Sequence, residues 1–139
     1  MKFSVIVPAY NEEKRIGQTL RSIRDFVRRQ GLDCELIAVD DGSTDRTAEV
    51  IRQEFAAMPD VNCRLLLNGR NRGKGFSVRR GMLEAGGDFC LFTDADLSTP
   101  IEELDKLKAE MDEGYDIAIG SRALPDSRVE IHQNFLRET

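Results

Sequence analysis

The feature of the sequence that most constrains the fold is an alternation of short apolar runs with longer amphipathic stretches. Apolar residues recur at helical spacing in the stretches 16–27, 48–55, 75–85 and 100–113. Between them, runs rich in Val, Ile, Leu and Phe have the length and composition of buried strands. These runs span residues 3–7, 35–39, 63–67, 89–93 and 116–119. The alternation predicts an α/β fold: a mostly parallel sheet with helices on both faces and right-handed crossovers.

The size and charge of the chain limit the number of domains and the classes of binding partner that we expect. Its 139 residues fit a single domain over positions 1–139. The net charge is -5, from 20 basic and 25 acidic residues that are interspersed rather than grouped. Such a distribution gives no general field for nucleic acid or an anionic membrane, so we expect no nucleic-acid partner. Any anionic ligand must be held locally.

The cysteines and the N-terminus indicate a reducing compartment. Cys34, Cys63 and Cys90 are odd in number, widely spaced and close to apolar runs, which is typical of buried free thiols. The apolar run at 3–7 is far shorter than a signal-peptide core or the ~20 residues of a membrane span. We therefore expect a cytoplasmic protein.

Polar residues concentrate where the predicted strands end. The first run leads into residues 8–12 (PAYNE), the second into 40–43 (DDGS) and the fourth into 94–96 (DAD). The beginnings of the runs show no such concentration. In parallel α/β sheets, ligands bind outside the carboxyl ends of the strands. These segments are therefore the candidate site.

The DAD segment is a candidate metal site. Residues i and i+2 at a strand end project to the same side, so Asp94 and Asp96 can share a divalent cation while Ala95 leaves space between them. A Mg²⁺ or Mn²⁺ ion bound this way keeps positions open for phosphate oxygens. With a nucleoside diphosphate sugar, the ion would neutralise the leaving diphosphate. The alternative is an ordinary polar turn before a helix capped near Ser98.

The second acidic segment allows two interpretations. Asp41 is placed to accept hydrogen bonds from a base or a ribose. Alternatively, the segment serves the next helix, which we expect to begin near Thr44 with Ser43 or Thr44 as its cap. Capping accounts for one residue but leaves the adjacent pair Asp40 and Asp41 unexplained.

Two basic groups could meet an anion at the same edge. Lys74 lies in a glycine-containing turn, residues 71–75 (NRGKG), and could approach a phosphate or the base, although the turn lacks Walker A spacing and could be a plain surface loop. Arg122 follows the fifth run and suits bidentate phosphate binding. His132, the only histidine, has no nucleophile at interpretable spacing, and neither a hydrolase triad nor a zinc site can be assembled.

Taken together, these segments resemble family 2 glycosyltransferases with the GT-A fold. The resemblance covers nearly the whole chain and is carried by residues 7–13 (VPAYNEE), 39–45 (VDDGSTD), 71–75 (NRGKG), 93–96 (TDAD) and 120–122 (GSR). It is closest to the polyprenyl-phosphate sugar transferases. Residues 93–100 (TDADLSTP) are more similar to the dolichyl-phosphate glucosyltransferase branch than to the mannosyl branch.

The resemblance implies roles for individual residues. Asp41 would bind the base, Asp94 and Asp96 the metal and diphosphate, and Arg122 a phosphate or the sugar, with Asp96 and Arg122 acting in catalysis. The remaining residues implied to contact the donor are Pro8, Ala9, Tyr10, Glu12, Val39, Lys74 and Ala95.

Two departures from the family pattern qualify these roles. Relatives of the mannosyl branch carry a metal-binding Gln where this chain has Ser98. Relatives also continue well past the position of Thr139, with residues that bind the acceptor, so we expect this chain to comprise the nucleotide-sugar-binding part.

The leading hypothesis is an inverting, metal-dependent glycosyltransferase. It would transfer a hexose from a nucleoside diphosphate donor, UDP-glucose first and GDP-mannose second, to a polyprenyl phosphate acceptor that attacks directly. One alternative is a domain that binds the donor without catalysing transfer. Another is a receiver-type signalling domain, in which the acidic pair would follow the first strand and a lysine the fifth.

Overall fold

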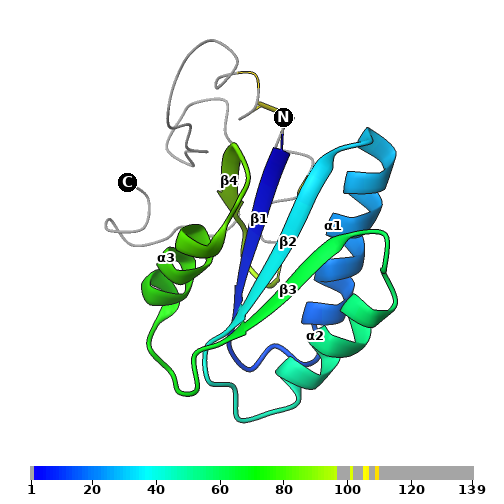
Figure 1. The fold of residues 1–139 in the computed structure, drawn as a ribbon. Coiled ribbons are helices and arrows are strands. Elements are labelled where there is room, and N and C mark those ends of the chain that lie inside the picture. Colours follow the sequence, from blue (N-terminus) through cyan, green and yellow to red (C-terminus); the bar gives the residue numbers. More distant parts are fainter. Residues whose placement is uncertain (1, 97–100, 102–104, 107–108, 110–139) are drawn as a thin grey trace, which may run out of the picture. The chain divides into compact units, whose positions relative to one another are not determined.

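The computed structural model describes residues 2–96, 101, 105, 106 and 109, and its elements follow the predicted alternation (Figure 1). The chain forms β1 (Lys2–Ala9), α1 (Ile16–Gln30), β2 (Asp33–Asp40), α2 (Thr47–Ala56), β3 (Asn62–Leu67), α3 (Lys74–Glu84) and β4 (Phe89–Phe92). The strands and helices predicted within this range are confirmed. The predicted strand at 116–119 and most of the predicted helix at 100–113 lie outside the described residues.

The sheet is parallel, with the strand order β3-β2-β1-β4. From β1 the chain moves outward through β2 to β3, and then returns to the other side of β1 to form β4. The direction of winding therefore reverses between β1 and β4. Receiver-like and flavodoxin-like sheets have the order 2-1-3-4-5. The observed order excludes the receiver-type alternative.

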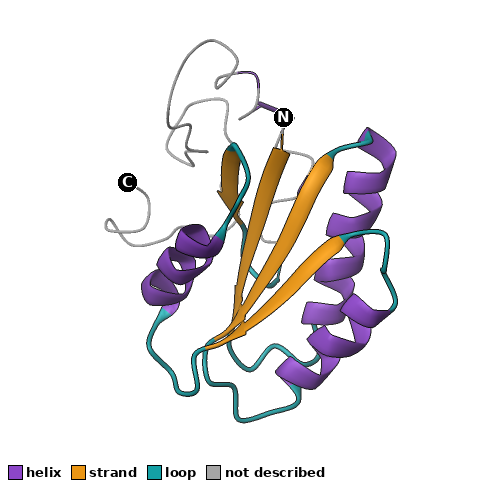
Figure 2. Ribbon diagram, viewed as in Figure 1, coloured by secondary structure: helices purple, strands orange, loops and turns teal. Residues whose placement is uncertain are grey.

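Helices cover both faces of the sheet, as predicted (Figures 1 and 2). Helices α1 and α2 pack together on one face, and α3 packs over β1 and β2 on the other. On the α3 side, Ile6, Ile37 and Val39 form a fully buried cluster with Ala85 against it. Helix α3 lies close to the sheet because residue 81 is glycine: a Cβ at Gly81 would be 2.5 Å from the Ile6 side chain. The core thus fixes how closely α3 packs on the sheet.

A buried carboxylate fastens the amino-terminal end of the sheet. Glu35 is 3% exposed. It accepts hydrogen bonds of 2.5 Å from Ser4 Oγ and 2.5 Å from the Gly86 amide, and Ser4 Oγ accepts one of 2.9 Å from Gly87. Burial raises the pKa of Glu35, but these hydrogen bonds and the charge of Lys2 outweigh burial and hold it below its ordinary value. Glu35 therefore ties the turn between α3 and β4 to β1.

The three free cysteines differ in environment, which corrects the expectation of three buried thiols. Cys34 is buried and Cys63 half-buried, and burial raises their pKa values to about 12 and about 11 respectively. Cys90 is exposed. Among the described helices, α3 packs mainly over β1 and β2, and Phe92, two residues further along the same face of β4 as Cys90, is also exposed.

Of the helices described, none has both the length and the apolar character that crossing a bilayer requires.

Candidate functional site

The segments that follow β1, β2 and β4 come together at the carboxyl edge of the sheet. Backbone hydrogen bonds continue past the strands: Asp41 N donates to Ala9 O at 2.9 Å, and Thr93 N donates to Ile6 O at 3.0 Å. The loops therefore leave the sheet side by side. Because the winding reverses between β1 and β4, a crevice is expected outside their carboxyl ends, where α/β sheets bind ligands. The acidic residues singled out in the sequence line this edge.

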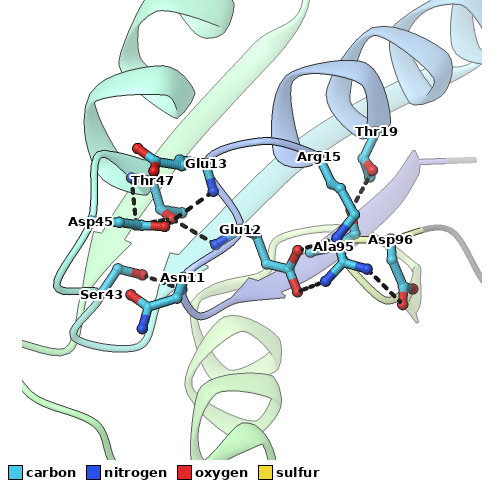
Figure 3. Close-up of polar contacts among 10 residues, drawn as sticks. All are labelled: Asn11, Glu12, Glu13, Arg15, Thr19, Ser43, Asp45, Thr47, Ala95 and Asp96. Carbon is cyan, nitrogen blue, oxygen red and sulfur yellow. Dashed lines mark hydrogen bonds and ion pairs between the residues drawn. The ribbon is translucent and has the colours of Figure 1, made fainter.

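The turn at 94–96 is anchored to α1 and is held between two cations. The buried hydroxyl of Thr19 donates a hydrogen bond to the carbonyl oxygen of Ala95 (Figure 3). Asp94 forms an ion pair with Lys74 Nζ, and Asp96 Oδ2 lies 4.0 Å from Arg15 Nη1. The side chains of Asp94 and Asp96 are 28% and 39% exposed. Each carboxylate thus has a cationic neighbour and is partly exposed to solvent.

Arg15 is a site residue that the sequence analysis missed. Its guanidinium binds Glu12 through two hydrogen bonds, of 2.7 and 2.9 Å, while also facing Asp96 (Figure 3). The hydrogen bond to Glu12 and the charge of Glu12 raise the pKa of Arg15 above its ordinary value. The spacing of Glu12 and Arg15, three residues apart, could have indicated the first contact. Arg15 thereby links the loop after β1 to the loop after β4.

Asp41 holds the loop that leads into α3. It is 4% exposed and accepts hydrogen bonds from Asn68 Nδ2 at 2.9 Å, from the Arg72 amide at 2.7 Å and from the Gly73 amide at 3.0 Å. Beside it, Gly42 has a φ of 69°, and a Cβ there would lie 2.2 Å from the backbone of residue 70. The structure therefore gives Asp41 a positioning role that the sequence did not indicate. Base binding by Asp41 stays a prediction.

The loop after β1 is bound tightly to the loop before α2 (Figure 3). Asn11, in the left-handed region with a φ of 51°, donates its amide to Ser43 Oγ at 2.9 Å. Its side-chain oxygen accepts a hydrogen bond of 2.8 Å from the Thr44 amide. The Glu12 amide donates to Thr47 Oγ1 at 2.8 Å. These contacts fix Glu12 near the reversal point of the sheet.

These contacts also correct the expected start of the second helix. Helix α2 begins at Thr47 rather than near Thr44, and neither Ser43 nor Thr44 caps it, because both are engaged with the loop after β1. Asp45 instead accepts a hydrogen bond of 2.9 Å from the Thr47 amide. Burial raises the pKa of Asp45, but the hydrogen bonds from Thr47 outweigh burial and lower it. A polar junction between two loops takes the place of a simple cap.

The other predicted site residues differ in accessibility. Pro8 and Val39 are paired in the sheet register, and the Val39 side chain is fully buried in the core. Ala9 is 3% exposed, whereas Tyr10 is 43% exposed and can reach a ligand with its side chain. Arg122 lies outside the described residues, as do Ser98 and His132.

The residues described fit a divalent cation with an incomplete protein ligand set. Nowhere in the described part of the chain do three or more His, Cys, Asp or Glu side chains gather to hold a metal. Asp94 and Asp96 offer carboxylate oxygens on one turn, and the cations beside them show that this position favours positive charge. A hard cation bound by one or two carboxylates leaves sites for substrate phosphates. That donor chemistry agrees with Mg²⁺ or Mn²⁺.

Comparison with known sequences agrees with the resemblance. Residues 4–131 match the family described as Glycosyl transferase family 2. A dolichyl-phosphate beta-glucosyltransferase of Dictyostelium discoideum is 38% identical over 96% of this chain and 44% of its own length. A dolichol-phosphate mannosyltransferase of Pyrococcus furiosus is 38% identical over 94% of this chain and 36% of its own length. The chain thus spans less than half the length of these relatives.

Solved structures share the fold. The mannosyltransferase PcManGT from Pyrobaculum calidifontis, in complex with GDP-Man and Mn²⁺, superposes with a TM-score of 0.62 and 33% identity, covering 68% of this chain and 27% of that one. TarS 1–349 of S. aureus, in complex with UDP-GlcNAc, gives a TM-score of 0.59 and 35% identity, covering 81% and 32% respectively. The predicted GT-A fold is confirmed.

Proposed function

The chain belongs to glycosyl transferase family 2, and we propose that it forms the donor site of an inverting, metal-assisted glycosyltransferase. The observation that carries the proposal is the position of Asp94 and Asp96. They leave β4 at the point where the sheet reverses its winding, opposite the loop after β1 that holds Glu12 and Arg15. Ligands of α/β sheets bind at such reversal points.

In this proposal, the edge of the sheet binds a nucleoside diphosphate sugar. Tyr10 and Glu12 border the nucleotide, and Asp41 acts on the base either directly or through the loop that it holds. Asp94 and Asp96 would hold Mg²⁺ or Mn²⁺, which supplies charge neutralisation for a departing diphosphate. Lys74 and Arg122 would contact phosphate or the sugar. The Mn²⁺ in the PcManGT structure supports a divalent ion.

For the acceptor we propose a polyprenyl phosphate. Both relatives described above are named for transfer to a dolichyl phosphate. A phosphate oxygen is already anionic at neutral pH, so it can attack the anomeric carbon without a strong protein base, and a single direct displacement inverts that carbon. Such an acceptor would place the protein at the cytoplasmic face of a membrane.

The donor we favour is UDP-glucose, with GDP-mannose second. The resemblance of residues 93–100 to the glucosyl branch and the glucosyltransferase of Dictyostelium discoideum support glucose. The mannosyltransferase relative and the GDP-Man complex support mannose. Neither Asp41 nor Lys74 distinguishes uracil from guanine, because each can pair with both.

Calorimetry tests this proposal. UDP, GDP and their glucose and mannose conjugates would be titrated into the full chain with and without MnCl₂, and Mn²⁺-dependent binding of one nucleotide is expected. No binding of any of them would refute the donor site. Donor binding without transfer to a polyprenyl phosphate would favour the second candidate, a nucleotide-sugar-binding unit that lacks catalytic activity.

A further inference from the structure

The carboxylates of the 94–96 turn already have cationic partners, and these come from different elements. Lys74 is the first residue of α3, and Arg15 immediately precedes α1. Lys74 Nζ contacts Oδ1 of Asp94, which is one of the oxygens that a metal ion would need. Two carboxylates two residues apart and partly removed from water repel each other, and a nearby cation stabilises their charged form. A nearby positive charge therefore stabilises the two ionised carboxylates of this turn.

The position of Lys74 is set by contacts that do not involve the turn itself. The preceding residue, Gly73, donates its amide to Asp41, and Ser77 in the first turn of α3 donates its hydroxyl to the Gly73 carbonyl at 3.2 Å. The Ser77 hydroxyl also accepts a hydrogen bond of 2.8 Å from Asn68. The backbone at Lys74 is thus fixed from two sides, so its ammonium group would stay near the turn even after separating from Asp94.

We propose that Lys74 is a resident counterion of Asp94, which a divalent cation displaces and which then binds the diphosphate of the donor. The inference rests on the proposed function and deepens it. A metal ion and Lys74 compete for the same carboxylate, so Lys74 opposes binding of the metal alone. A bound metal repels the ammonium group, while phosphate oxygens at the open coordination positions attract it. Lys74 therefore weakens the binding of the metal ion alone and strengthens the binding of the nucleotide.

These opposite effects on affinity distinguish the proposed role from simpler ones. If Lys74 only stabilised the loop, its replacement would weaken the binding of both ligands. A residue that only binds phosphate would leave the affinity for metal unchanged. Displacement predicts that replacing Lys74 strengthens metal binding and weakens nucleotide binding in the same variant.

The experiment compares the full wild-type chain with Lys74→Met. Titration with MnCl₂ alone, with free Mn²⁺ followed by electron paramagnetic resonance, is expected to show about fivefold tighter binding in Lys74→Met, since one partly exposed ion pair no longer competes. Calorimetry with UDP and GDP at saturating Mn²⁺ is expected to show about tenfold weaker binding of the nucleotide that the wild type prefers. Thermal unfolding would establish that each variant is folded.

Two further variants are the controls. Arg79→Met removes one positive charge from the exposed side of the same helix and should leave both affinities near those of the wild type. Lys74→Arg keeps the positive charge and should not tighten Mn²⁺ binding.

The outcomes separate this inference from the proposed function. If the wild type bound neither Mn²⁺ nor nucleotide, the proposed function would fail and the inference with it. If the wild type bound both, but Lys74→Met bound Mn²⁺ no more tightly, displacement would be overturned while the donor site stood. Tighter Mn²⁺ with unchanged nucleotide affinity would overturn the second half of the proposal.

Discussion

The two ends of the sheet both hold acidic side chains, but they hold them with different partners. At the amino-terminal end, Glu35 is 3% exposed and is bound by a hydroxyl and a backbone amide. At the carboxyl end, Asp94 and Asp96 are 28% and 39% exposed and face Lys74 and Arg15. Neutral donors built into the fold cannot leave, whereas ammonium and guanidinium groups on long stems can. The kind of partner, rather than the presence of acid, distinguishes a structural carboxylate from one available to a ligand.

Asp41 shows that the distinction is not simply one of position. It lies at the carboxyl end, yet it is 4% exposed and accepts hydrogen bonds from two backbone amides and an asparagine. In its bonding it resembles Glu35 more than Asp94. Substitutions at these carboxylates should therefore separate stability from binding.

The largest effect on stability is expected at Glu35. Glu35→Ala would leave Ser4 Oγ and the Gly86 amide without their acceptor and would lower the free energy of unfolding by about 3 kcal/mol. Urea denaturation measures this loss. Glu49→Ala, at an exposed carboxylate on α2, is the control and should change stability by less than about 0.5 kcal/mol. If Glu35→Ala lowered the free energy of unfolding equally little, Glu35 would not be a structural carboxylate.

The reverse result is expected at Asp96. Asp96→Asn should weaken Mn²⁺-dependent nucleotide binding by about 100-fold, since it removes a carboxylate at the proposed metal site, while stability stays within about 0.5 kcal/mol of the wild type. Calorimetry and urea denaturation of the same preparation would measure both. Should Asp96→Asn instead destabilise the fold and leave binding intact, the carboxyl end would be structural too.

An intermediate result is expected at Asp41. Asp41→Asn replaces one of the two acceptor oxygens with an NH₂ group. The Arg72 amide donates to Oδ1 and the Gly73 amide to Oδ2, so one of these two amides loses its acceptor, and we expect a loss of about 2 kcal/mol in unfolding free energy. Nucleotide binding should fall only as far as the loop is disturbed. A large loss of binding with unchanged stability would show that Asp41 acts on the base directly.

The smallest effect expected is a change in the pH dependence of stability. The pKa of Glu35 lies below its ordinary value in the folded chain, despite burial, because of its hydrogen bonds with Ser4 and Gly86. Its stabilisation is therefore present above the unfolded-state pKa of about 4.3 and is lost as the pH falls through the lower folded-state value. The difference in unfolding free energy between the wild type and Glu35→Gln should shrink as the pH is lowered from 6 to 3. If that difference in unfolding free energy grew on acidification, the pKa of Glu35 would be raised on folding rather than lowered.

Much of the fold could be predicted from the sequence because local patterns determine it. Apolar runs and helical spacing gave the strands and helices within the described range, with β2 one to two residues longer at its ends than the run 35–39. The predicted beginning of α2 was wrong because Ser43 and Thr44, which are good capping residues in isolation, are both bound by Asn11. Asn11 is 32 residues from Ser43 and 33 residues from Thr44. Long-range partners overrode a local preference.

The sequence could predict only those site residues that directly follow one predicted strand. Asp94 and Asp96 could be identified from their spacing and their place after an apolar run. Arg15 and Thr19 could not, because their contacts with residues 95 and 96 depend on β4 pairing with β1. No spacing along the chain encodes which strands become neighbours. The same holds for the contact between Lys74 and Asp94.

The close packing of α3 on the sheet has a consequence for how Lys74 would exchange with a metal ion. Even a Cβ at residue 81 would collide with Ile6, so α3 packs directly against β1. Lys74 can leave Asp94 by rotation about its side-chain bonds without any shift of α3, and for an accessible residue such rotation takes picoseconds to nanoseconds. Under the proposal, the exchange of Lys74 for a metal ion would then be limited by the arrival and dehydration of the ion rather than by the lysine side chain.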